Sequence, residues 1–291
     1  MSTHQKKTAV RWLSTLVAFT AVAIMLFPIY SIIVASFEST VTLFSTQFHF
    51  FPYHPTLANY KTVILGTQSG PAGSVTTSGS QLANVLTSLE IALGTTLLTL
   101  VISVPAAYAL AKYRMRTTIL FIGALLIAQI VPSIVLATSL FAILQKAHLV
   151  NTLPGVIIAD GTYSIPFGIL VLRAFMFSLP NELMHSARVD GASEWQTFRM
   201  IVVPLARSAI ITVAVFAFLA GWGDFIFALT TLNGASFQPI TLGIYSFLGN
   251  YQANWGAVMA AGVVALVPAG VLLVIAQRYI ATGLTAGAVK G

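Results

Sequence analysis

The segment Leu179–Leu205, LPNELMHSARVDGASEWQTFRMIVVPL, is the longest run in the second half of the chain without membrane-spanning character. It holds three of the seven acidic residues, Glu182, Asp190 and Glu194, and the bases Arg188 and Arg199. The sequence on both sides of it is apolar. A charged segment between apolar runs predicts a hairpin that projects from a membrane and is available to a partner in the cytoplasm.

This hairpin carries the end signals of two short helices. Pro180 suits a first helical position, where the missing N–H costs nothing, and Asp190-Gly191 is typical of a helix end, because glycine tolerates the left-handed conformation there. Ser193 and Gln196 have the spacing of a capping box. The pattern predicts helix, tight turn, helix, and a helix lying at the lipid interface is the alternative. The expected apolar residues are Leu183, Met184 and Ala187 in the first helix, and Trp195, Phe198 and Ile201 in the second.

The composition indicates a membrane protein. Of the 291 residues, 57% are hydrophobic and only 7% are charged, whereas soluble domains carry roughly 25% charged residues. The net charge of +7 does not indicate a nucleic-acid partner, because the chain has no basic run beyond Lys6-Lys7. The absence of cysteine excludes disulfides and thiolate metal sites.

Six apolar runs are long enough to cross a bilayer as helices, so we expect an all-α polytopic fold. The first is too long for a signal peptide and lacks a cleavage site. The third contains Pro132, and we expect the fourth to be broken at Gly161, Pro166 and Gly168. The expected spans are Trp12–Phe37, Leu89–Ala111, Thr118–Leu144, Leu153–Phe175, Val202–Leu232 and Trp255–Ile280.

The distribution of bases sets the expected orientation. Of the 14 Lys and Arg residues, only Lys61 and Lys146 fall in the outer loops if the N-terminus is cytoplasmic, as the positive-inside rule requires. We therefore expect residues 1–291 to form one transmembrane domain with a Gly/Ser-rich, flexible insert at 66–80. Its expected parts are a cytoplasmic N-terminus (1–11), outer loops (38–83 and 233–253), a cytoplasmic hairpin (177–201) and a cytoplasmic tail (281–291).

Three carboxylates lie in or beside apolar spans, where such groups usually face protein or water. Glu90 is near the outer end of its span, and we interpret it as structural. Asp160 and Asp224 have two open interpretations, a place on a solute path or a structural pair. Candidate neighbours on such a path are Tyr163, Trp222 and Phe225.

Motifs of covalent chemistry are absent from the sequence. There is no P-loop, no H-E-x-x-H and no G-x-S-x-G, and the histidines are scattered. We expect no catalytic residue and no metal site in this chain.

The hairpin resembles the EAA loop of binding-protein-dependent ABC importer permeases, whose consensus is roughly E-A-A-x-x-D-G-A followed by an apolar stretch and a proline. Here it reads HSARVDGA over residues 185–192, with Pro204 downstream. The resemblance extends over most of the chain and is greatest to the carbohydrate-uptake, maltose-type subunits. Its other elements are PTLANY (55–60), AAYALAKYR (106–114), WGDF (222–225) and GLTAGAVKG at the C-terminus.

The resemblance implies that the hairpin is a coupling helix that docks on a separate ATPase, and helix-in-groove recognition suits it. His185 replaces the family's glutamate and Ser186 its first alanine, which puts one contact to the ATPase in question. The implied coupling residues are Glu182, His185, Ser186, Ala187, Asp190, Gly191 and Ala192.

By the same resemblance, the chain is one permease of a sugar or polyol importer in a bacterial inner membrane. Its implied partners are a second permease, two ATP-binding subunits that carry ATP and Mg²⁺, an extracytoplasmic solute-binding protein and membrane lipid. The solute itself stays open. An alternative function is an ion- or proton-coupled transporter that uses Asp160 and Asp224 without an ATPase.

Overall fold

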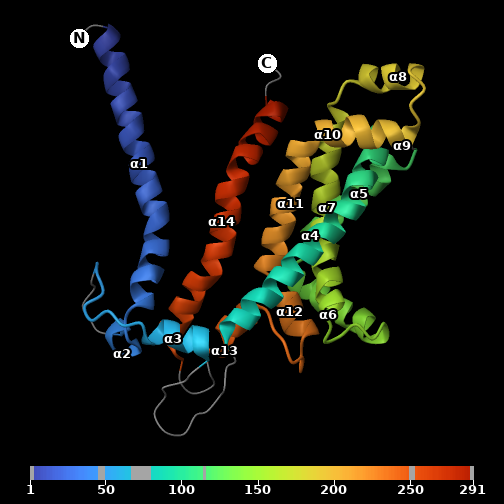
Figure 1. Ribbon diagram of the computed structural model, residues 1–291. Helices are drawn as coiled ribbons and strands as arrows, with labels where there is room; N and C mark the ends of the chain where they lie inside the picture. The colour runs from blue at the N-terminus through green and yellow to red at the C-terminus, as the bar shows by residue number, and fades with distance from the viewer. Residues whose placement is uncertain (1–2, 45–49, 67–79, 114–115, 249–252, 289–291) are drawn as a thin grey trace. The chain divides into compact units, whose positions relative to one another are not determined.

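The computed structural model describes residues 3–44, 50–66, 80–113, 116–248 and 253–288, and within these ranges the chain is helical with connecting turns (Figure 1). The all-α prediction is therefore confirmed. Most of the Gly/Ser insert expected at 66–80 lies outside the described residues. The chain divides into two compact units, Met1–Leu82 with Ile244–Leu266, and Ala83–Gly243 with Val267–Gly291.

The first unit contains α1 (Thr3–Ser36), α2 (Thr40–Leu43), α3 (Ala58–Leu65) and the first part of α14 (Trp255–Ala288). The PTLANY motif joins α3 to the end of α1, because the buried Asn59 amide donates to the carbonyls of Ser36 (2.9 Å) and Glu38 (2.7 Å). These bonds satisfy carbonyl groups left free at and just beyond the end of α1. Val63 of α3 packs in an apolar cluster with Phe247, Ala257, Ala260 and Ala261.

The second unit is built on α4 (Gln81–Lys112), α7 (Leu153–Phe177) and α11 (Arg207–Trp222). Small residues let these helices approach closely, as is common in membranes. A Cβ added to Gly168 of α7 would lie 3.0 Å from the Ser103 hydroxyl of α4 and 3.1 Å from Val213 of α11. Interhelical hydrogen bonds join α4 to α7, with Thr99 and Ser164 2.9 Å apart.

Among the described residues, four helices are long and apolar enough to cross a membrane, and the number rises to six if each of two bent helix pairs is one span. The first pair is α5 (Thr118–Ile130) and α6 (Ser133–Lys146), bent by 104°. The expected third span, Thr118–Leu144 with Pro132 inside it, is thus divided into two helices at that proline. Pro132 has no N–H to donate, and its ring forces Val131 into an extended conformation (ψ 124°), which ends α5.

The prediction that the fourth span is broken is wrong, because α7 is one continuous helix that contains Pro166. Gly161 and Gly168 do not interrupt it. They are buried against α4 instead, where Leu98 and Ser103 occupy the space that a side chain would need.

The fifth span was expected at Val202–Leu232, and the structure divides this range into several helical segments. After α11 the chain breaks at Gly223 and resumes as α12 (Ile226–Thr231). Helix α13 (Ile240–Ser246) follows, and α14 continues to Ala288, beyond the expected end of the sixth span at Ile280.

Candidate functional site

The hairpin begins with α8 (Asn181–Val189), which Figure 1 shows at one end of α7, opposite α6 and α12. Pro180 is its N-cap, one position before the predicted one. As predicted, α8 ends at its C-terminal side with Gly191, whose φ is +83°. Gly191 N–H donates to the Arg188 carbonyl (3.1 Å) and Ala192 N–H to that of Ala187 (2.9 Å), the two bonds of a Schellman motif.

The second helix, α9 (Glu194–Thr197), starts with the predicted capping box. Gln196 N–H donates to the Ser193 hydroxyl (3.2 Å), and the Gln196 side chain accepts from Ser193 N–H (2.7 Å). The turn between α8 and α9 is therefore fixed at both ends by hydrogen bonds within the hairpin.

Helix α9 continues as a π-helical turn, η1 (Phe198–Val202), and then as α10 (Val203–Leu205). The Val203 N–H donates to the carbonyl of Phe198, five residues back. Pro204 lacks an N–H, and the helix bends by 75° between Leu205 and Arg207. A proline next to a π turn accounts for such a bend. Residues Glu194–Leu205 thus form one arm of a bent pair whose other arm is α11, and only the two arms together are long and apolar enough to count as one span.

The apolar face of α8 turns mainly toward the chain itself. Met184 is buried in a cluster with Tyr108, Met176 and Phe198, and Ala187 is also buried, whereas Leu183 is 43% exposed. The prediction of a single apolar face is therefore only half correct, because Leu183 lies outside the buried face. Of the implied coupling residues, Ala187 is buried and Ala192 half-buried; the exposed ones are Glu182, His185, Ser186, Asp190 and Gly191.

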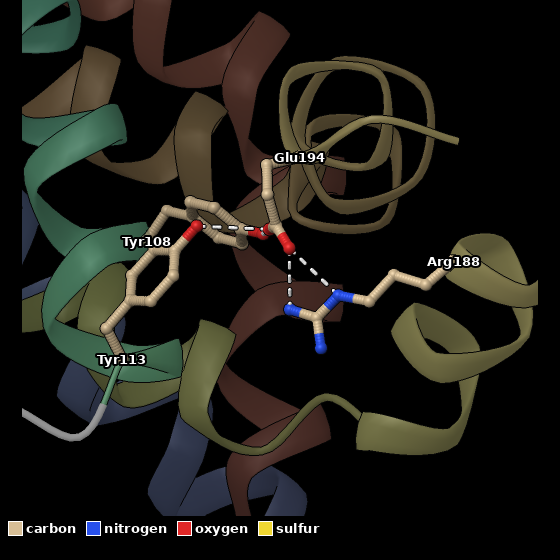
Figure 2. A network of polar contacts seen from close by, with 4 residues as sticks. All are labelled: Tyr108, Tyr113, Arg188 and Glu194. Carbon is tan, nitrogen blue, oxygen red and sulfur yellow. Dashed lines mark hydrogen bonds and ion pairs between the residues drawn. The ribbon is translucent and has the colours of Figure 1, made fainter. Parts of the chain in front are cut away.

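Glu194 connects the two hairpin helices to the end of α4 (Figure 2). Its Oε1 accepts from Nε and Nη2 of Arg188, both at 2.8 Å. Its Oε2 accepts from the hydroxyls of Tyr113 (3.0 Å) and Tyr108 (3.4 Å). The hydrogen bonds from Arg188 and Tyr113 hold the pKa of Glu194 below its ordinary value. Burial, and then the bond to Glu194, raises the pKa of Tyr113.

Further contacts join α4 to the segment that precedes the hairpin. Lys112 Nζ donates to the Leu179 carbonyl (2.8 Å) and to Asn181 Oδ1 (3.1 Å). Arg173 Nε donates to the Leu110 carbonyl (3.3 Å). Our sequence interpretation missed these roles of Tyr108, Lys112, Tyr113 and Glu194, although three of the four belong to the AAYALAKYR motif.

The residues expected on a solute path differ in exposure. Asp160 is buried and accepts from the Thr95 hydroxyl (3.4 Å). Asp224 caps α12, accepting from the backbone N–H groups of Phe227 (3.1 Å) and Ala228 (2.8 Å).

The three aromatic candidates also lie in different environments. Trp222 is buried and stacks on Phe218, with ring centroids 5.9 Å apart, and Phe225 is half-buried. Tyr163 is 40% exposed, and its carbonyl accepts from Gln129. Among the described residues, no three His, Asp or Glu side chains are grouped as a metal ion would require.

Comparison with known proteins settles the family. The model of the binding-protein-dependent transport system inner membrane component family matches residues 6–285. The chain belongs to this family. The permease interpretation of the sequence is therefore confirmed over the ion-coupled alternative, and the assignment of residues 185–192 to the EAA loop stays a prediction.

Several transport permeases are similar to this chain along most of their length. It is 36% identical to the trehalose transport system permease SugB of Mycobacterium tuberculosis over 71% of this chain and 76% of that one. It is 32% identical to the sulfoquinovosyl glycerol permease SmoH of Agrobacterium fabrum (91% and 89%). It is 31% identical to the diacetylchitobiose uptake permease DasC of Streptomyces coelicolor (92% and 92%).

Solved structures show the same fold. A chain of a bacterial ABC transporter involved in alginate import superposes with a TM-score of 0.75 at 17% identity, over 96% of this permease and 98% of that chain. A second structure of an alginate transporter, in complex with a pentasaccharide-bound periplasmic protein, gives a TM-score of 0.66 at 16% identity (94% and 95%).

Proposed function

We propose that this permease forms half of the translocation path of a sugar importer and that its hairpin couples this path to a separate ATPase. The observation that carries the proposal is a hairpin whose first helix ends and whose second helix begins with specific hydrogen bonds, and whose polar side chains are exposed. A rigid projection of this kind can transmit a displacement, whereas a flexible loop would absorb it.

The coupling surface consists of the exposed positions Glu182, His185, Ser186, Asp190 and Gly191. Ala192 lies at its edge. Ala187 is buried, so it supports the surface from beneath and does not contact the ATPase. His185 and Ser186 are exposed in place of the family's Glu-Ala, so the partner's groove must accept an imidazole and a hydroxyl there instead of a carboxylate and a methyl group.

The proposed assembly follows the family pattern. Residues 1–291 form one transmembrane domain with both termini and the hairpin (177–201) in the cytoplasm, and the loops 38–83 and 233–253 face outward. A second permease completes the path, two ATPase subunits bind ATP and Mg²⁺, and an extracytoplasmic protein delivers the solute. The alginate transporter crystallised with a periplasmic protein supports the last partner.

A sugar or related polyol is the proposed solute class. The relatives named above carry trehalose, sulfoquinovosyl glycerol and diacetylchitobiose in their names, and each of these contains a sugar. Tyr163 is the most accessible of the residues proposed for the solute path. Asp160, Trp222, Asp224 and Phe225 lie deeper, so in this proposal they shape the path.

The test uses two glycines with left-handed backbone, Gly191 (φ +83°) and Gly234 (φ +96°), at which an added Cβ would meet nothing within 4 Å. Proline requires φ near −65°, so Gly191→Pro opens the hairpin and Gly234→Pro disturbs a proposed outer loop to a similar local extent. Each variant is expressed with its transport partners, and membrane insertion, co-purified ATPase and solute uptake are measured.

We expect both variants to insert in the membrane, and only Gly191→Pro to lose the ATPase and all uptake. Retention of the ATPase and normal uptake by Gly191→Pro would contradict the coupling role. Recovery of the wild-type chain without any ATPase would contradict the importer assembly itself.

A further inference from the structure

The end of α4 contacts the hairpin through an aromatic and polar cluster made of Tyr108, Tyr113, Arg188, Glu194 and Phe198. Tyr108 packs on Tyr113 (ring centroids 6.0 Å apart) and on Phe198 (5.1 Å). Glu194 accepts hydrogen bonds from both tyrosines through one oxygen and from Arg188 through the other (Figure 2). One carboxylate therefore joins three helices, α4, α8 and α9.

Hydrogen bonds also attach α4 to α7 at several positions along the two helices. Thr99 bonds Ser164, Thr95 donates to Asp160, and Arg173 donates to the Leu110 carbonyl. Lys112 adds two bonds to the turn between α7 and α8. A displacement of α8 that keeps the Glu194 bonds must therefore carry α4 and α7 with it.

We propose that Glu194 is a positioning residue that fixes the coupling hairpin to α4, so that the hairpin, α4 and α7 move as one body when the ATPase moves the hairpin. The proposal rests on the proposed function of the hairpin as the ATPase contact. It adds the residue that passes the displacement to the spans and the helix that receives it.

A role in stability alone does not account for this arrangement. The Arg188 and Glu194 side chains are 47% and 48% exposed, and exposed ion pairs contribute little to folding. The carboxylate instead fixes an orientation. It accepts two bonds from Arg188 on one side and one from each tyrosine on the other, and these four bonds together hold α9 in a single position relative to α4. Loss of Glu194 should leave a folded hairpin, since the capping box and the Schellman motif do not involve its side chain.

The experiment measures this orientation directly. The chain contains no cysteine, so spin labels can be placed at Val101→Cys on α4 and Val189→Cys on α8, which are 63% and 87% exposed. The distance distribution between the labels is recorded in the assembled importer. The variants are Glu194→Leu, which removes all acceptors, Glu194→Gln, which keeps one neutral acceptor oxygen, and Arg199→Gln as a control on an exposed residue of η1.

The same preparations give the co-purified ATPase and the solute moved per ATP hydrolysed. We expect Glu194→Leu to broaden the distance distribution and to lower the solute moved per ATP by about 2- to 30-fold, the range seen for residues that carry coupling. Glu194→Gln should be intermediate and Arg199→Gln unchanged. The bound ATPase and the membrane-inserted yield should equal those of the wild type.

An unchanged distance distribution with unchanged solute per ATP in Glu194→Leu would overturn the proposal. So would loss of the bound ATPase in that variant, because Glu194 would then be a contact and not a positioning residue. If the wild-type chain binds no ATPase at all, the proposed function fails. The label distances still report whether Glu194 orients the hairpin.

Discussion

The close packing of α11 on α4 at Gly221 yields a prediction with a magnitude. A Cβ built on this buried glycine would lie 3.1 Å from the Cα of Ala92 and 3.2 Å from Cβ and Oγ1 of Thr95. Ordinary contacts begin at 3.4 Å, and the nearest atom belongs to the backbone, which cannot rotate away. In Gly221→Ala, therefore, the two helices must separate by a few tenths of an ångström.

Gly123 of α5 is the matched control, because its Cβ would meet nothing within 4 Å. Both substitutions gain about 1 kcal/mol of helix propensity, so this gain cancels in the comparison. Overpacking costs about 1–3 kcal/mol, and we expect Gly221→Ala to be less stable than Gly123→Ala by that amount. The assay is the unfolding free energy of each purified variant in mixed detergent micelles. Equal stabilities would refute the packing argument.

Three further predictions concern single side chains. Asp224→Asn should retain uptake and stability because asparagine also caps a helix, whereas Asp224→Ala should lose about 1 kcal/mol; abolished uptake in Asp224→Asn alone would point to a role of the charge. Asn59→Ala removes the buried amide that donates to the carbonyls of Ser36 and Glu38 and should destabilise the protein by about 1–3 kcal/mol, measured by thermal unfolding. The pKa of Glu194 is lowered from 4.5, so its bonds stabilise the hairpin fully above pH 4.5 and are lost as the pH falls through the lower, folded-state value. The distance between labels at 101 and 189 should broaden only below pH 4.5, and broadening at neutral pH would contradict this sign.

Local signals in the sequence predicted the hairpin well. Gly191 and the pair Ser193 and Gln196 act within a few residues of themselves, so their hydrogen bonds depend little on the rest of the fold. The apolar spans followed from composition for the same reason, since length and hydropathy are properties of the segment alone.

The breaks within the spans could not be assigned from local sequence. Pro132 and Pro166 are both prolines in apolar runs, yet one ends a helix and the other lies inside one. Gly161 and Gly168 likewise suggested a break but serve close packing. In each case the outcome depends on what the neighbouring helices supply, and one sequence does not contain that information.

The hydrogen-bond partners of Glu194 at the end of α4 could not be predicted from local sequence patterns either. Tyr108 and Tyr113 are 86 and 81 residues away in the sequence, and their contact with the carboxylate exists only once α4 and the hairpin are packed. The face of α8 was ambiguous for a similar reason. Leu183 and Met184 are adjacent and equally apolar, and only the position of α4 decides which one is buried.

The π turn at Phe198–Val202 has a consequence for insertions and deletions. A π turn accommodates one residue more than an α turn, and each residue rotates an α-helix by about 100°. Deleting one residue between Phe198 and Val202 would therefore restore ordinary α-helix in front of Pro204. It would also turn α9 and α8 about the helix axis by that angle and separate Glu194 from both tyrosines. The number of residues in this turn therefore sets the rotation of the hairpin about the helix axis, and each residue added or removed changes it by about 100°.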